Sequence, residues 1–274
     1  ELKAMYSAAG VSHVLALSGL HVGILSCILL WLFYPLTYLK HGRKILAFLV
    51  VCLLWLFAFI SGLSSSVVRA VVMYSLYTFA SFCSEERFSG MHSLVLAAFL
   101  MLIYNPFFLF DISFQLSFTA VFSILAFYPL FSRWLCIKNC VLRYVWNTLS
   151  LSISAQLGTL PFILYYFGSF PTYFLLVNLV VVILAGGILM LTLVALCIAS
   201  VPMVGSTVMT LLEWCTSVLN ESTRWVQQLD GSQITSVYLS SSQACLLTAV
   251  IICFTTCQWQ NGSLPSICMR CWNR

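Results

Sequence analysis

The segment AGVSHVLALSGLHVGIL, residues 9–25, decides the fold class because it has the composition of a membrane helix interrupted by polar groups. Two histidines, two serines and three glycines lie among its apolar residues. An ionisable or hydroxyl side chain in hydrocarbon costs free energy unless a protein group or water binds it. The segment therefore predicts a membrane-embedded helix with one side turned toward a polar interior.

The rest of the chain has the composition of a membrane protein. Of its 274 residues, 62% are apolar and only 7% are charged, and the mean hydropathy is +1.04. About a quarter of the residues of a soluble domain are charged, so this composition excludes a water-soluble domain. A crossing helix needs ~20 apolar residues. We therefore expect an all-α fold, a polytopic transmembrane helical bundle of about nine spans, with a break or strong tilt in the first helix near residues 18–23.

Apolar runs between polar breaks give the expected span boundaries. The spans are residues 12–39, 45–61, 66–83, 92–105, 112–131, 145–166, 172–200, 204–220 and 243–257. Residues 204–220 include Glu213 and several hydroxyl residues, so this segment either crosses the membrane or lies on its surface. We expect one transmembrane domain over residues 1–257 and a polar cytoplasmic tail over 258–274. Because the chain begins with Glu1, we also expect it to be part of a longer protein.

Basic loops predict the orientation, since Lys and Arg are enriched in short cytoplasmic loops. They contain Lys40, Arg43 and Lys44, then Arg133, Lys138 and Arg143, and finally Arg270 and Arg274. With nine crossings all three groups lie on the same side, which places the N-terminus outside. The net charge of +5 is thus mostly a signal of membrane topology.

Two charged residues lie within or beside apolar segments. Arg69 either reaches lipid headgroups or faces inward toward a buried partner or an anionic cargo. The second alternative is favoured by Gly62 and residues 64–66, which place free N–H groups and hydroxyls at a helix start. Asp111 is either a helix N-cap or, together with Gln115 and Ser117, part of a set of polar side chains that faces protein. Both residues are expected near the outer ends of their helices.

We therefore expect Arg69 and Asp111 to pair, with His13 close enough to join them. Gly19 and Gly23 form a GxxxG motif, which lets another helix approach closely. Ser18 and His21 share one helix face, and Asn178 is suited to an interhelical hydrogen bond.

Three strings in fixed order resemble the competence domain of the ComEC family, the inner-membrane channel proteins of natural transformation. They are AGVSHVLALSGLHVGIL at 9–25, SGLSSSVVRAVVM at 61–73 and NPFFLFDISFQLSFTAV at 105–121, with a weaker match at 154–182. The resemblance covers nearly the whole chain. It implies a multi-pass protein of the bacterial inner membrane that passes single-stranded DNA into the cytosol. The implied partners are the lipid bilayer, the DNA-uptake machinery, and OB-type or nuclease-type domains outside this chain.

The residues that match the family strings are the candidates for channel lining or DNA contact. They are Ser12, His13, Ser18, Gly19 and His21 in the first string, Arg69 with Ala70 in the second, and Asp111, Phe114, Gln115 and Ser117 in the third. Two further candidates come from the residues themselves: Ser65, from the serine run at the helix start, and Asn178, from the polar residues of the later spans. A strand with one phosphate charge per nucleotide needs water, a cation or oriented N–H groups, and surfaces on which bases stack. Arg69 and Phe114 are the residue types that supply such contacts.

Other function classes fit less well. The seven acidic residues and four histidines are dispersed, so we expect no metal, no cofactor and no enzymatic activity. A proton- or ion-coupled small-solute transporter remains the alternative, because it also buries His, Arg and Asp within a bundle. An intramembrane serine protease would use Ser18, but only His92, at a loop edge, follows as a histidine partner near a later span. The oligomeric state is left open.

Overall fold

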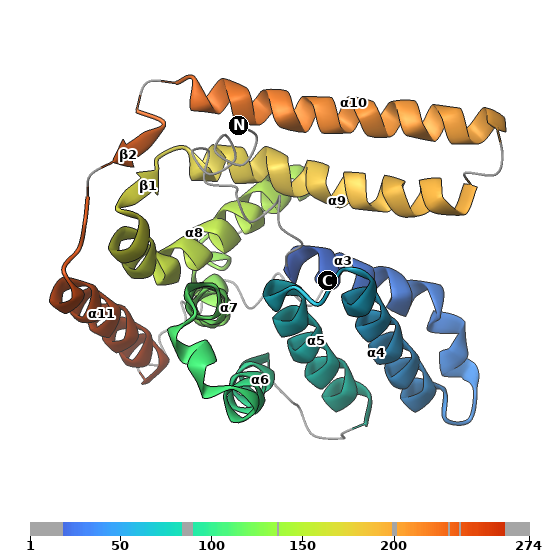
Figure 1. Ribbon diagram of the computed structural model, residues 1–274, viewed down its shortest axis with the longest axis horizontal. Helices are drawn as coiled ribbons and strands as arrows, with labels where there is room; N and C mark the ends of the chain where they lie inside the picture. The colour runs from blue at the N-terminus through green and yellow to red at the C-terminus, as the bar shows by residue number, and fades with distance from the viewer. Residues whose placement is uncertain are drawn as a thin grey trace. The chain divides into compact units, whose positions relative to one another are not determined.

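The computed structural model describes residues 19–83, 90–135, 137–198, 202–229, 231–235 and 237–260. In these ranges the chain forms nine α-helices, two short 3-10 helices and two three-residue strands (Figure 1). The described part of the chain divides into two compact units, one up to residue 122 and one from residue 123 onward.

The unit up to residue 122 is a set of helices around α5. Its elements are α3 (Gly19–Leu32), η1 (Tyr34–Tyr38), α4 (Gly42–Ile60), α5 (Ser65–Cys83), α6 (Gly90–Tyr104), η2 (Pro106–Phe110) and the first half of α7 (Ile112–Phe131). Helix α5 packs against α3, α4 and α6, and η1 packs against α4. Because α5 is the shared neighbour, its side chains determine which groups are buried in this unit.

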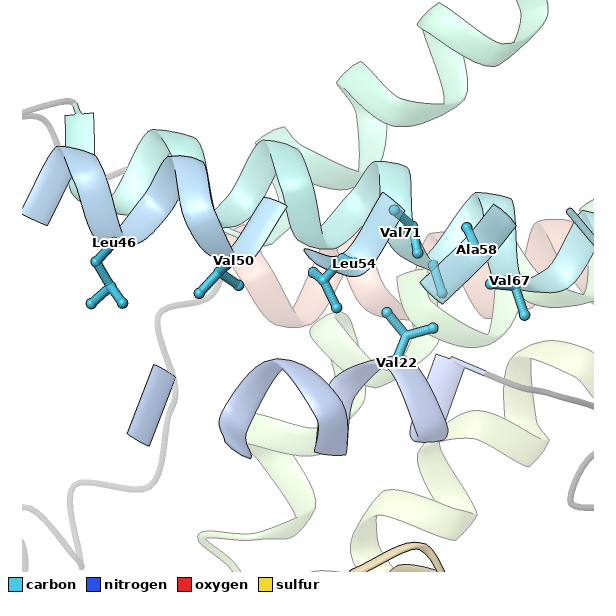
Figure 2. Close-up of a cluster of buried hydrophobic side chains, with 8 residues drawn as sticks. Val22, Leu46, Val50, Leu54, Ala58, Val67 and Val71 are labelled. Atoms are coloured by element: carbon cyan, nitrogen blue, oxygen red, sulfur yellow. The ribbon is translucent and has the colours of Figure 1, made fainter. Parts of the chain in front are cut away.

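A cluster of aliphatic side chains joins α3, α4 and α5 (Figure 2). It consists of Val22, Leu46, Val50, Leu54, Ala58, Val67, Ala70 and Val71. The four α4 members recur every four residues, so one face of that helix is buried. This packing fixes the rotation of α5 and thereby the position of Arg69, which lies between the cluster members Val67 and Ala70 in the sequence.

The turn between α4 and α5 is a Schellman motif. Gly62 and Leu63 both have positive φ angles, 79° and 50°. The N–H of Leu63 donates to the Ala58 carbonyl at 2.9 Å, and the N–H of Gly62 donates to the Phe59 carbonyl at 3.1 Å. The motif ends α4 and returns the chain at once into α5, which packs back along α4.

The second unit contains the remainder of α7 and a series of longer helices. Its elements are α8 (Cys140–Phe167), β1 (Ser169–Pro171), α9 (Phe174–Ile198), α10 (Pro202–Gln227), β2 (Gln233–Thr235) and α11 (Ser241–Gln260). Helices α9 and α10, yellow and orange in Figure 1, run antiparallel side by side, and α8 packs against both α9 and α11. Strands β1 and β2 pair antiparallel, with Phe170 opposite Ile234.

The expected all-α fold is confirmed, with the two short strands as a small addition. Each expected span overlaps one α-helix, and the 112–131 prediction has the same bounds as α7. Among the residues that the structure describes, four helices are long and apolar enough to cross a membrane: α4, α7, α8 and residues Phe174–Thr192 of α9. Length and composition therefore leave the number of nine crossings a prediction.

The first helix is interrupted at a different place from the break expected near residues 18–23. Residues 19–32 form one continuous helix, and the interruption falls at Phe33, followed by η1 with Pro35 in its first turn. Proline lacks the N–H that would continue the α-helical hydrogen bonds, so it explains the end at this position. Residues 12–18 lie outside the described part. At the other end α11 continues to Gln260, past the expected domain boundary at 257, and most of the expected tail is not described.

Candidate functional site

A buried arginine near the start of α5 is the centre of the candidate site. Arg69 is 2% exposed. Its Nη2 donates a hydrogen bond to the Ser113 hydroxyl at 2.8 Å. Its Nη1 lies 3.8 Å from Asp111 Oδ2, with the Asp111 side chain 38% exposed. The predicted pairing of Arg69 and Asp111 is thus confirmed, and the alternative in which Arg69 reaches headgroups is wrong for this structure.

Asp111 has two functions at the start of α7. Its Oδ1 accepts a hydrogen bond from the Ser113 N–H at 3.1 Å, which caps the helix. Its other carboxylate oxygen faces Arg69. The two alternatives predicted for Asp111, a helix cap and a group that faces protein, therefore hold together.

The bend between η2 and α7 holds Asp111 in place. The Gln115 amide nitrogen donates to the Leu109 carbonyl at 2.8 Å, which closes the bend from the α7 side. Phe114 is buried, with its ring centroid 4.3 Å from that of Phe118 and 6.4 Å from that of Phe108. Phe114 and Phe118 therefore contact each other in a tilted arrangement, with an interplanar angle of 35°, and a DNA base would have to displace one ring to stack on the other.

The Arg69 guanidinium has donors left over. It carries five N–H groups, yet its buried Nε has no hydrogen-bond partner among the described residues. The ion pair with Asp111, at 3.8 Å, is longer than a hydrogen bond. An incompletely paired cation in a low-dielectric site attracts an anion strongly. Chemically, the site can exchange the half-exposed carboxylate for another anionic oxygen.

The glycines of α3 have the predicted packing function. A Cβ on Gly19 would meet the Ala70 Cβ at 3.7 Å, and a Cβ on Gly23 would overlap the Tyr74 hydroxyl. Both neighbours belong to α5, so the GxxxG motif brings α3 close to the helix that contains Arg69. His21 lies half-buried on the same helix.

The remaining predicted residues are not all gathered at Arg69. Ser65 is exposed as the first residue of α5, and Ser117 is half-buried on α7. Asn178 belongs to the other unit, on α9, where its Oδ1 is buried without a hydrogen-bond partner among the described residues. Ser12, His13 and Ser18 lie outside the described residues, so the predicted place of His13 stays a prediction.

Ser113 is the functional residue that the sequence analysis missed. It follows Asp111 by two residues, where its N–H meets the cap and its hydroxyl meets Arg69. The sequence does contain a signal for this residue: an aspartate that can cap a helix, followed in the first helical turn by a hydroxyl residue. Among the residues that the structure describes, no three His, Cys, Asp or Glu side chains gather to hold a metal ion.

These features define the class of protein first: a helical membrane protein with an ion pair at the ends of two of its helices. The chain belongs to the Competence protein family, whose model matches residues 1–262. This confirms the resemblance to the ComEC competence proteins.

Two relatives match parts of the chain. Over 182 residues it is 33% identical to ComE operon protein 3 of Bacillus subtilis (strain 168), covering 66% of this chain and 22% of that protein. Over 163 residues it is 33% identical to an uncharacterized protein of Aquifex aeolicus (strain VF5), covering 60% of this chain and 35% of that protein. The matches therefore span about a fifth and about a third of the relatives. No solved structure matches the chain significantly.

Proposed function

We propose that this chain forms a transmembrane passage for single-stranded DNA in the cytoplasmic membrane of a bacterium during natural transformation. Membership of the Competence protein family supports a function in DNA uptake. The observation that carries the proposal further is Arg69, a buried cation whose partners among the described residues are a serine hydroxyl and a long ion pair. Intramembrane charges are expensive and mark ion or substrate pathways.

The chemistry of the strand matches this arrangement. Each nucleotide brings one negative phosphate, and a phosphate oxygen can replace the Asp111 carboxylate beside Arg69. Asp111 is partly exposed, so water can solvate the displaced carboxylate, while the phosphate supplies the counter-charge that Arg69 loses. Asp111 competes with the phosphate for Arg69, which suits a passage, because conduction requires that each bound group leave again.

The proposal assigns no catalysis to this chain. The DNA-uptake machinery and OB-type or nuclease-type domains outside this chain deliver and process the DNA, and the chain carries the strand through the bilayer.

Uptake of labelled single-stranded DNA into cells that carry variants of the chain tests the proposal. We expect Arg69→Ala and Asp111→Ala each to reduce uptake, because each breaks the ion pair. Arg43→Ala is the matched control, since it also removes a positive charge, but from an exposed position at the start of α4. The amount of each variant in the membrane is measured in parallel.

The charge swap Arg69→Asp with Asp111→Arg separates a specific pair from general damage. If the pair itself matters, the double variant regains part of the uptake that each single variant loses. Normal uptake in Arg69→Ala cells at normal protein level would refute the proposal. Normal uptake together with a lost solute flux would point to the ion-coupled transporter instead.

A further inference from the structure

Helices α9 and α10 form a hairpin whose two outward faces differ sharply in chemistry. The residues of α9 whose exposure the structure describes as high recur at helical spacing and are apolar: Leu176, Val180, Ile183, Gly187, Met190 and Val194. Such a face fits lipid. The two helices pack along each other, so the exposed face of α10 is expected at the same membrane depth.

The exposed face of α10 carries a polar stripe with the same spacing. The stripe consists of Ser206, Thr210, Glu213, Ser217, Glu221 and Arg224, all of which are exposed. On the other side of the helix, the buried residues Leu219, Thr223 and Val226 turn toward α9, its main neighbour. Leu211, Trp214 and Trp225 are exposed beside the stripe. Helix α10 thus has one face for α9, an apolar flank and one polar face.

The pairing of β1 with β2 decides whether α10 crosses the membrane. Strand β1 precedes α9 and β2 follows α10, so the two strands lie on the same side of the bilayer. The chain between them therefore crosses an even number of times. Since α9 contains an apolar candidate span, α10 has to return through the membrane beside it. This argument favours the crossing alternative for residues 204–220 over the surface alternative.

We propose that the polar stripe of α10 lines a water-filled path through the membrane domain. A Glu near the middle of a crossing helix costs several kcal/mol in hydrocarbon, on the order of 3, whereas water removes this cost. Glu213 is eleven residues from Pro202 and fourteen from Gln227, so it lies near mid-helix. This inference rests on the proposed function. It adds a lining surface on α10, where none of the candidate residues predicted from the sequence lies.

The chemistry of the stripe suits passage of an anionic strand without tight binding. The Ser217 hydroxyl can donate to phosphates or water, and the Thr210 hydroxyl, which donates to the Ser206 carbonyl at 3.0 Å, can still accept from water, while Arg224 is paired with Glu221 at 3.2 Å. The carboxylates do not attract phosphate, so they do not hold the strand in place. A wall with weak, repeated polar contacts agrees with the requirement that a conducted group leave each site.

Thiol labelling tests the water-filled path. In a variant of the full protein with its 12 cysteines replaced by alanine, single cysteines are introduced by Thr210→Cys and Ser217→Cys. The matched controls are Met190→Cys and Ile183→Cys on the apolar face of α9. Along the chain, Met190 is as far from residue 200 as Thr210 is, and Ile183 is as far from it as Ser217 is. A water-soluble maleimide is applied to membrane vesicles, and labelling is followed by mass spectrometry.

We expect labelling at least about tenfold faster at the two stripe positions, because the reactive thiolate forms readily in water and poorly in hydrocarbon. Equal, slow labelling at stripe and control positions would overturn the proposal and would indicate that a partner or a second copy covers the stripe. Ser206→Cys and Arg224→Cys should react from opposite sides of the membrane. Reaction of both from one side would show that α10 lies flat on the surface, and would overturn it too.

A measurement on the unmodified sequence remains if the cysteine-free variant does not fold. A water-soluble carbodiimide couples an amine to carboxylates that contact water, and the modified peptide is quantified with Glu213→Gln as the blank. Modification of Glu213 in vesicles supports the path, and its absence contradicts it. Neither readout involves DNA, so a labelled stripe with uptake unaffected by Arg69→Ala would refute only the proposed function.

Discussion

At the scale of single residues, the site depends on Asp111, whose two carboxylate oxygens have different partners. Oδ1 of Asp111 caps α7 through the Ser113 N–H, and Oδ2 faces Arg69. Asp111→Asn keeps a cap acceptor and removes the charge, whereas Asp111→Ala removes both. The two substitutions therefore separate the stabilisation of a helix end from the neutralisation of a buried cation.

We expect Asp111→Ala to lower the free energy of unfolding by about 1 kcal/mol more than Asp111→Asn, which is the usual contribution of an N-cap. Both should be destabilising, because each leaves Arg69 without its counter-charge. Thermal unfolding of the purified protein in detergent measures the difference. Equal stability of the two variants would mean that the cap does not contribute.

Ser113→Ala removes the hydrogen-bond acceptor of the buried guanidinium. A hydrogen bond to a charged group contributes about 1.5–3 kcal/mol, so we expect a loss in that range in the same unfolding measurement. Ser117→Ala is the matched control, since it is the same substitution about one turn further along α7. A loss no larger than that of the control would contradict the geometry described for Arg69.

At the scale of helices, the GxxxG motif gives an asymmetric prediction. Gly19→Ala adds a methyl group at ordinary contact distance from Ala70, whereas Gly23→Ala pushes a methyl group into the Tyr74 hydroxyl. We expect Gly23→Ala to cost about 1–3 kcal/mol of stability, as overpacking usually does, and Gly19→Ala to cost much less. Unfolding midpoints of the two variants give the comparison.

Tyr74→Phe provides the matching test of cause. It removes the oxygen that the added methyl group would overlap, so Gly23→Ala in a Tyr74→Phe background should regain part of the lost stability. If the double variant is as unstable as the sum of the two single variants, the contact between α3 and α5 is not the origin of the loss.

The sequence predicted the helices well because their ends carry local signals. The break at residues 61–64 contains the glycine that a Schellman motif uses, and Asp111 and Asn139 cap the helices that follow them. The sequence also predicted the pairing of Arg69 with Asp111, because a buried charge requires a partner of opposite charge and the expected topology offered only a few such partners. Ser113 and the fit of Gly23 to Tyr74 depend on side-chain geometry across helices, which no local pattern encodes.

At the scale of the whole molecule, contacts between distant residues restrict the number of crossings where composition does not. Helices α5, α6 and α10 do not qualify as spans by length and composition. The Arg69 and Asp111 pair nevertheless places the starts of α5 and α7 on one side of the membrane, so α5 and α6 either both cross or both do not. Since α5 packs back along the candidate span α4 after a tight turn, both crossing is the consistent solution.

Reporter fusions test this topology in cells. Reporters placed after residues 63 and 105 should be active on one side of the membrane, and reporters after residues 40 and 134 on the other, because α4, α7 and the α5 and α6 pair separate these positions. Helix α6 has 15 residues, or ~22 Å, against a hydrocarbon core of ~30 Å. This short helix can still span the membrane if Phe107 and Phe110, both largely exposed on η2, lie in the interface that aromatic side chains prefer. Activity at 63 and 105 on opposite sides would exclude the ion pair as a feature of the membrane-inserted protein, since Arg69 and Asp111 would then be separated by the bilayer.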